Sequence, residues 1–192
     1  MNICVYGAAS NAIDERFLNT GYALGKAIAE RRHSLIFGGG DTGMMGAVAR
    51  GAHENGAHVT GIAPEYFNVD GVLYPLNDEI IYTKTMRIRK QKMEDMSDGF
   101  IVSPGGVGTL EEFFELFTQK QLGRLKKPLA ILNTDGYYDP MFEMLNYMVE
   151  KNFIGKKNID QFLVTDDIKK ALDYIEDPDE ITVNTEELRH LK

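Results

Sequence analysis

The feature that most limits how this chain can fold is a repeated alternation of short apolar runs with longer segments of helical period. The short runs are apolar throughout, which is typical of strands in a parallel sheet covered on both faces. This alternation implies right-handed crossovers and predicts an α/β fold, a doubly wound parallel sheet. We expect strands at 3–6, 35–37, 58–62, 100–102 and 129–132, helices near 13–31, 43–55, 84–97, 109–123, 139–151 and 166–176, and a long loop over 65–81.

Length and composition indicate a single domain over 1–192, since no internal repeat, low-complexity segment or linker divides the chain. A formal net charge of −8 argues against a nucleic-acid partner, which would call for a basic face. The sequence has neither the pattern of a signal peptide nor an apolar run long enough to span a bilayer, so we expect no membrane association. With Cys4 as the one cysteine, disulfides cannot hold the fold, and we expect a cytoplasmic protein.

Glycines follow three of the expected strands. They are Gly7, the run Gly38-Gly39-Gly40, and Gly105, Gly106 and Gly108. In a doubly wound sheet, ligands bind at the carboxyl ends of the strands, near the point where strand order reverses. A tight turn explains any one cluster equally well, but three clusters at the same edge indicate a binding site that includes Gly39.

The segment Ser103-Pro-Gly-Gly-Val-Gly-Thr-Leu-Glu-Glu112 joins an expected strand to an expected helix. Such a junction offers free backbone N–H groups at the positive end of the helix dipole. Glycines let the backbone approach a phosphate closely, and Thr109 adds a hydroxyl. No Lys-Ser/Thr pair follows the last glycine, so this is not a Walker A loop. The segment predicts a phosphate site without triphosphate chemistry.

Glu112 has two interpretations. The spacing Thr109-x-x-Glu112 fits a capping box, in which the carboxylate would only satisfy the N-cap amide. Alternatively, Glu112 lies off the phenylalanine stripe of the helix and beside the phosphate site, where it could bind sugar hydroxyls or orient water. Spacing alone leaves both interpretations open.

The expected helix before this strand supplies basic residues. Because residues three and four apart share a helix face, Met86, Arg89, Lys90 and Met93 fall on one arc. Arg87 lies outside it, as ordinary solvated charge does. A buried guanidinium needs an anionic partner, so we expect Arg89 to face a cleft that holds an anion.

Three segments together resemble the Lonely Guy (LOG) family. They are Gly38-Gly-Gly-Asp-Thr-Gly-Met-Met-Gly46, Arg89-Lys90 and Pro104-Gly-Gly-Val-Gly-Thr-Leu-Glu-Glu112, the last of which matches the family motif PGGxGTxxE in full. The likeness continues through Lys127-Pro128 and 133–139 to Phe153-Ile154, and covers roughly residues 1–155.

Members of this family are cytokinin riboside 5′-monophosphate phosphoribohydrolases, some of them labelled lysine decarboxylases. The resemblance implies a Rossmann-like fold, a homodimer, and hydrolysis of the N-glycosidic bond of a nucleoside 5′-monophosphate, cytokinin riboside monophosphate or AMP, without a metal or redox cofactor. It implies catalytic roles for Arg89 and Glu112. The substrate-binding positions that it implies are Lys90, Gly105, Gly106, Gly108, Thr109 and Thr118.

The chain departs from the family pattern in its first loop. Where the family usually has Gly-Ser-Ser, this chain has Gly7-Ala8-Ala9-Ser10, so Ser10 is the hydroxyl left to hold phosphate. Arg87 and Gln119 replace a frequent histidine and a tryptophan of the family. These departures bear on substrate preference more than on reaction type.

Two other functions compete with this one. A non-catalytic nucleotide or cofactor carrier would need the glycines and Arg89 but not a carboxylate at Glu112, so the presence of both favours an enzyme. A pyridoxal-phosphate lysine decarboxylase is rejected, because nothing marks a Schiff-base lysine and the chain is short for that architecture.

Overall fold

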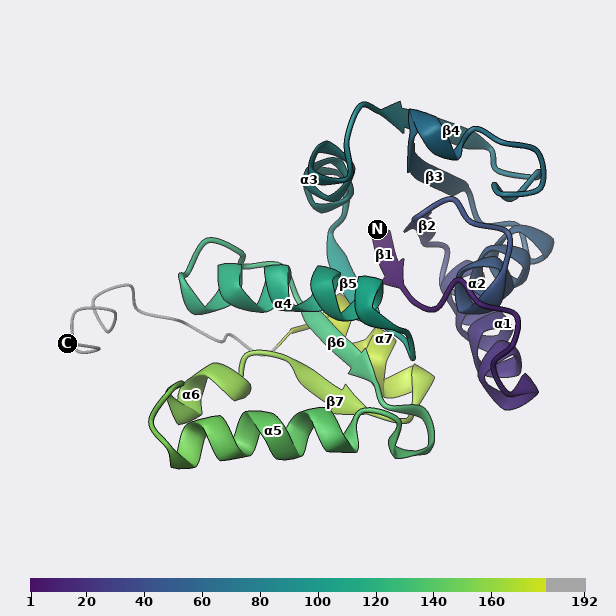
Figure 1. The fold of residues 1–192 in the computed structure, drawn as a ribbon. Helices are drawn as coiled ribbons and strands as arrows, with labels where there is room; N and C mark the ends of the chain where they lie inside the picture. Colours follow the sequence, from purple (N-terminus) through teal and green to yellow (C-terminus); the bar gives the residue numbers. More distant parts are fainter. Residues whose placement is uncertain (179–192) are drawn as a thin grey trace.

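A sheet of seven parallel strands forms the centre of the computed structural model, which describes residues 1–178 (Figure 1). The strands are β1 Asn2–Tyr6, β2 Ser34–Phe37, β3 Val59–Pro64, β4 Glu79–Thr83, β5 Gly99–Val102, β6 Leu129–Leu132 and β7 Leu163–Thr165. They lie in the order β4-β3-β2-β1-β5-β6-β7. The chain therefore starts in the middle of the sheet, builds one half as far as β4, and returns to β5 on the other side of β1. The strand order reverses between β1 and β5, which is the switch point where such sheets bind ligands.

Helices cover both faces of this sheet (Figure 1). They are α1 Glu15–Glu30, α2 Gly43–Glu54, α3 Met86–Met96, α4 Val107–Gln121, α5 Asp139–Glu150, α6 Lys156–Ile159 and α7 Ile168–Glu176. On one face α1 and α2 bury Leu24 and Val48, and on the other α3 and α4 bury Met93 and Phe113. The prediction of a doubly wound α/β fold is confirmed.

The central strands show why their runs are apolar throughout. In β1, Ile3 and Val5 belong to the core on one face, while Cys4 and Tyr6 belong to the core on the other. All four side chains are buried. Because successive side chains point to opposite faces, a strand covered on both sides needs an apolar residue at every position.

The two edge strands were not predicted from the sequence. The prediction of a long loop over 65–81 is wrong at its C-terminal end, because Glu79–Thr83 forms β4 and pairs in parallel with β3. Glu79 and Tyr82 are exposed, so the strand lacks the continuous apolar run of the central strands. The short strand β7 at the opposite edge was also missed. An edge strand has only one neighbour and carries a weaker hydrophobic pattern.

The predicted single domain extends over 1–192, and its segment 179–192 lies outside the described residues. Residues 1–178 contribute to one continuous sheet. Within them, no helix is both long enough and apolar enough to cross a bilayer.

Candidate active site

A cavity of about 680 Å³ opens at the carboxyl ends of the central strands. Its lining comes from the loops after β1, β2, β3, β5 and β6, and from helices α1 to α4. This volume lies within the range of small-molecule sites, and the position is the switch point of the sheet. Two of the predicted glycine clusters, at 38–40 and 105–108, contribute to the wall, as does Gly7.

The loop between β5 and α4 presents unpaired backbone amides to the cavity. Helix α4 begins at Val107 after Gly106, which provides no side-chain cap. Within residues 1–178, the N–H groups of Gly106, Val107, Gly108 and Thr109 have no hydrogen-bond acceptor. A Cβ added to Gly106 or Gly108 would meet no atom within 4 Å. Free amides and open space at a helix N-terminus are the features that anion-binding sites use.

Tyrosines hold this loop in place. The hydroxyl of Tyr137 donates to the carbonyl oxygen of Gly105 at 2.9 Å, and that of Tyr138 donates to the carbonyl oxygen of Ser103 at 2.8 Å. Ser103 in turn donates to the carbonyl oxygen of Tyr6 at 2.7 Å. Because these hydrogen bonds fix the carbonyl groups of the loop, they also fix the orientation of its backbone N–H groups before a ligand binds.

Arg89 and Glu112 form a buried ion pair in the wall of the same cavity. The Arg89 Nη1 atom donates to Glu112 Oε1 at 2.9 Å, and Nε donates to the carbonyl oxygen of Ile62 at 2.9 Å. The two charged side chains are only 5% and 10% exposed, and both residues line the cavity. Gly38 makes room for this arrangement, since a Cβ there would lie 2.1 Å from Arg89 Nη2.

Burial raises the pKa of Glu112 above its ordinary value, and the facing Arg89 guanidinium opposes this increase. Desolvation penalises the charged carboxylate, whereas the adjacent cation favours it. A carboxyl group with a raised pKa in a cleft, next to a specific charge partner, is a frequent feature of catalytic sites.

The capping-box interpretation of Glu112 is wrong. It requires Thr109 as the N-cap, but α4 begins two residues earlier, at Val107, with Gly106 as its N-cap. Thr109 therefore lies inside the first turn and is buried against Gly105. The carboxylate of Glu112 accepts from Arg89, across the cavity wall, and not from its own helix.

The predicted site residues divide into two groups. Those that line the cavity are Ser10, Arg89, Gly105, Gly106, Gly108, Thr109 and Glu112. Gly39, Lys90 and Thr118 do not line it within one chain. Gly39 accepts from the amide of Tyr74 instead. Lys90 pairs with Glu111 and Glu115, and Thr118 is exposed on the outer part of α4.

Several lining residues were not predicted from the sequence. They are mainly apolar: Ile13, Phe17, Met45, Phe67, Val72 and Tyr137, whereas Met86 lies on the predicted arc of Arg89. Tyr137 lies in the family-like stretch 133–139, which could have drawn attention to it. Phe67 and Val72 come from a segment without period, so nothing in the sequence marked them. Within the described chain, no three His, Cys, Asp or Glu side chains come together as a metal site.

Fold and pocket together define the class: a Rossmann-like α/β protein with its ligand pocket at the switch point of the sheet. The model of a family described as "Possible lysine decarboxylase" matches residues 45–175. The cytokinin riboside 5′-monophosphate phosphoribohydrolase of Mycobacterium tuberculosis is 38% identical over 170 residues, covering 88% of this chain and 90% of that protein. The cytokinin riboside 5′-monophosphate phosphoribohydrolase LOG of Oryza sativa subsp. japonica is also 38% identical, over 154 residues or 80% of this chain. The chain belongs to the LOG family.

The match to the rice protein spans 64% of that protein's length. Solved structures with a similar fold include a molybdenum cofactor binding protein from Rippkaea orientalis, with a TM-score of 0.68, 21% identity and coverage of 91% of this chain and 93% of that one. The Moco carrier protein from Chlamydomonas reinhardtii has the same TM-score, 24% identity and coverage of 91% and 94%. At these identities the likeness concerns the fold alone.

Proposed function

We propose that this protein is a nucleoside 5′-monophosphate phosphoribohydrolase, which hydrolyses the N-glycosidic bond to release the free base and ribose 5-phosphate. The observation that carries the proposal is the buried Arg89–Glu112 pair, with 2.9 Å between Nη1 and Oε1, in the same cavity as the free amides of α4. The named relatives at 38% identity support this reaction.

In this reaction the amides at the start of α4 bind the 5′-phosphate. Gly106 and Gly108 allow the backbone close approach, and the helix dipole favours the negative charge. Glu112 follows Gly108 by four residues, about 6 Å along the helix. A nucleotide held by its phosphate at the helix start therefore has its ribose beside the Glu112 carboxylate. Binding energy from the phosphate thus serves to orient the reacting bond.

Breaking the ribosyl–base bond develops positive charge on the sugar, as in glycoside hydrolysis. The Glu112 carboxylate stabilises this charge and orients the attacking water. Arg89 opposes the increase that burial causes in the pKa of Glu112 and so favours the charged carboxylate, and its bond to Ile62 fixes the guanidinium. The residues present carry out these steps with charge and orientation alone, and we propose no metal or redox cofactor.

A carrier function on the same fold is the competing proposal. A binding protein for an anionic ligand gains nothing from a carboxylate in its pocket, because like charges repel and burial of the carboxylate is itself unfavourable. Glu112 is nevertheless buried in the wall of the cavity. Arg89 offsets only part of the cost of burying this charge, and a carboxylate that acts on the ligand explains its position, so it favours the enzyme.

For substrate scope, we propose AMP and cytokinin riboside monophosphate, and with the latter a role in cytokinin formation. The test is to incubate the purified protein with AMP, GMP, CMP and N6-isopentenyladenosine 5′-monophosphate and to assay free base and ribose 5-phosphate. Release of both products in equal amounts from a purine nucleotide is the expected result. Tight binding of these nucleotides without any product would establish the carrier instead.

We further propose that the protein is a cytoplasmic homodimer. A single buried Cys4 thiol suits a reducing compartment. Helix α4 exposes Val107 and Phe114, apolar side chains that a second copy could cover. Light scattering at micromolar concentration should give the mass of a dimer, and a monomer would contradict the proposal.

A further inference from the structure

Two consecutive tyrosines after β6 donate to the loop that joins β5 to α4, but their hydrogen bonds have different consequences. Tyr137 donates to the carbonyl oxygen of Gly105 at 2.9 Å. Tyr138 donates to the carbonyl oxygen of Ser103 at 2.8 Å. In a trans peptide group, the C=O of one residue and the N–H of the next point in opposite directions, and the described chain contains no cis peptide bond. The bond from Tyr137 therefore sets the direction of the Gly106 N–H, which points away from the hydroxyl.

The bond from Tyr138 directs none of the free amides. The carbonyl of Ser103 shares its peptide group with Pro104, which has no N–H. The backbone N–H of Gly105 interacts with the Tyr138 hydroxyl, so the protein itself occupies it. The N–H of Gly106, by contrast, has no acceptor among residues 1–178 and is the first of the free amides at the cavity. Of the two tyrosine bonds, the one at Gly105 is therefore the one that acts on a free amide.

The peptide group between Gly105 and Gly106 has glycine on both sides, so the backbone alone does not fix its orientation. Gly106 has a φ of −87° and a ψ of −156°, and a half-turn of this peptide group would give it a positive φ. Glycine adopts positive φ without steric cost, and the glycine before it accepts the accompanying change in ψ. The turned-over peptide would present the carbonyl oxygen of Gly105 in place of the N–H, and that oxygen repels an anion. A hydrogen bond to the carbonyl selects the orientation that offers the donor.

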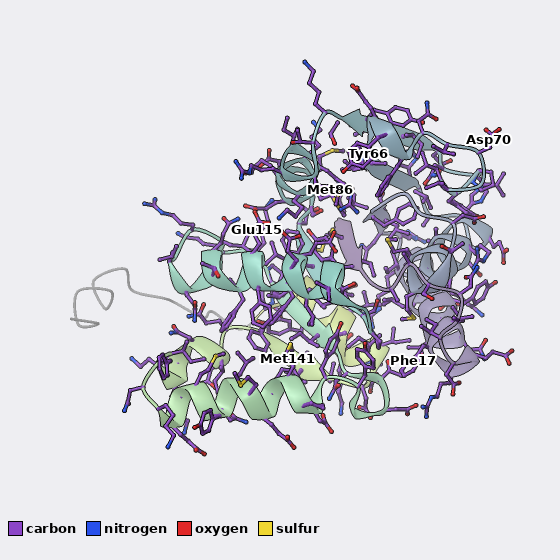
Figure 2. All side chains as sticks on the ribbon, in the orientation of Figure 1. Phe17, Tyr66, Asp70, Met86, Glu115 and Met141 are labelled. Carbon is purple, nitrogen blue, oxygen red and sulfur yellow. The ribbon has the colours of Figure 1, made fainter. Side chains whose placement is uncertain are left out.

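Tyr137 is itself held in place from two sides. Its backbone N–H donates to the carbonyl oxygen of Thr134 at 3.1 Å, which closes a tight turn. Gly136 within that turn has a φ of 70°, and a Cβ there would lie 2.5 Å from Asp139 Oδ2, so the turn requires glycine. Figure 2 shows Phe17 between α1 and this turn, and its ring packs edge-on against that of Tyr137 with 5.7 Å between the centroids. The hydroxyl is therefore presented to the loop by a fixed ring.

From this geometry we infer that the Tyr137 hydroxyl is a positioning group for phosphate binding, because it holds the Gly105–Gly106 peptide group with its N–H toward the 5′-phosphate of the substrate. The inference rests on the proposed function and adds to it a residue outside the Arg89–Glu112 pair. Tyr137 acts on the ligand through the loop and not on the bond that breaks. Its loss should therefore raise KM for a phosphorylated substrate, change kcat little, and leave an unphosphorylated substrate unaffected.

The experiment compares the wild type, Tyr137→Phe and the matched control Tyr138→Phe, since each variant removes one hydroxyl from the same loop and keeps the ring. The value of kcat/KM is measured for the nucleoside 5′-monophosphate that the wild type hydrolyses best and for its nucleoside, which lacks the phosphate. In Tyr137→Phe, the ratio of nucleotide to nucleoside should fall about 10-fold, the scale of one hydrogen bond to the phosphate. In Tyr138→Phe the ratio should stay as in the wild type. Tyr138 is only 3% exposed, so its variant should show the larger decrease in Tm.

An unchanged ratio in Tyr137→Phe would overturn the inference, and so would an equal fall in Tyr138→Phe, since the site would then respond only to the stability of the loop. If the wild type hydrolyses no nucleotide, the proposed function fails, and the ratio is then taken from dissociation constants for AMP and adenosine measured by calorimetry. A ratio about 10-fold smaller in Tyr137→Phe alone would support the inference without the activity. An unchanged ratio, or a wild type that binds the two compounds equally, would refute it.

Discussion

Helices α2 and α4 both begin after glycine-rich loops at the same edge of the sheet, but the two loops use their glycines differently. At α2, a Cβ on Gly46 would lie 1.8 Å from the carbonyl oxygen of Asp41, and one on Gly43 would lie 2.4 Å from that of Ala8. The amide of Gly43 donates to Asn11 Oδ1 at 2.8 Å. These glycines allow the protein to pack closely against itself, and the amide of Gly43 is already satisfied.

At α4 the situation is reversed. A Cβ on Gly106 or Gly108 would meet open space, and within residues 1–178 the amides of the first turn find no protein acceptor. No packing constraint requires glycine at these two positions. A glycine cluster therefore indicates a ligand site only where the structure leaves both the space and the amides unused.

The largest expected effect concerns the carboxylate beside the α4 site. Glu112→Gln removes the charge but keeps an acceptor for Arg89, so kcat should fall about 100-fold or more, the scale of a lost charge-stabilising group. The free energy of unfolding should fall by about 3 kcal/mol, because the buried Arg89 guanidinium keeps a hydrogen-bond acceptor but loses its charge partner. Glu143→Gln, which removes an exposed carboxylate from α5, is the control for net charge. A fully active Glu112→Gln enzyme would mean that the charge of Glu112 is not needed for hydrolysis.

The second effect tests whether the free amides of α4 hold a phosphate. Adenosine lacks the group that these amides bind, so its kcat/KM should be about 100-fold below that of AMP, as expected when two charge-assisted hydrogen bonds are lost. Base release is measured for both compounds under the same conditions. Comparable turnover of adenosine and AMP would remove the functional difference between the two helix starts.

A matched pair of substitutions tests the difference between the glycines of α2 and those of α4. Gly46→Ala forces a Cβ against the backbone of Asp41 and should lower the free energy of unfolding by about 1–3 kcal/mol. Gly108→Ala enters open space, so stability should stay within about 0.5 kcal/mol while KM for AMP rises about 10-fold. Urea unfolding and initial rates measure the two quantities. If both variants lose stability equally, the glycines of α4 are structural after all.

The sequence predicted the parts of this structure that depend on burial and local chemistry. The five central strands were visible because a strand covered on both faces is apolar at every position, as in β1. Arg89 was expected to face a cleft with an anionic partner because a buried guanidinium requires one, and the structure supplies Glu112. The predicted catalytic and substrate-binding roles of these residues remain predictions.

The parts that were missed depend on tertiary contacts. Helix α4 begins at Val107 and not at Thr109, because Val107 and Gly108 already belong to its first turn, which no local pattern reveals. Phe67 and Val72 reach the cavity because β4 pairs with β3 and because backbone hydrogen bonds join the segment before β4 to Gly39 and Asp41. Lys90 shares a helix face with Arg89 by spacing, yet it pairs with Glu111 and Glu115 instead of lining the cavity.

The smallest expected effect is the dependence of stability on pH at the α4 site. Burial raises the pKa of Glu112 in the folded state above its ordinary value of 4.5, with Arg89 opposing the increase. Below 4.5 the folded and unfolded chains both hold the proton, so the group contributes nothing. As pH rises toward the folded pKa, the folded chain retains a proton that the unfolded chain has lost, so stability falls with pH over this window and is level above it.

Glu112→Gln lacks this group, and the difference in unfolding free energy between wild type and variant should therefore shift in favour of the variant across the window. Urea unfolding of both proteins at a series of pH values measures that difference. A shift in the opposite direction would mean that Arg89 outweighs burial and holds the pKa of Glu112 below its ordinary value.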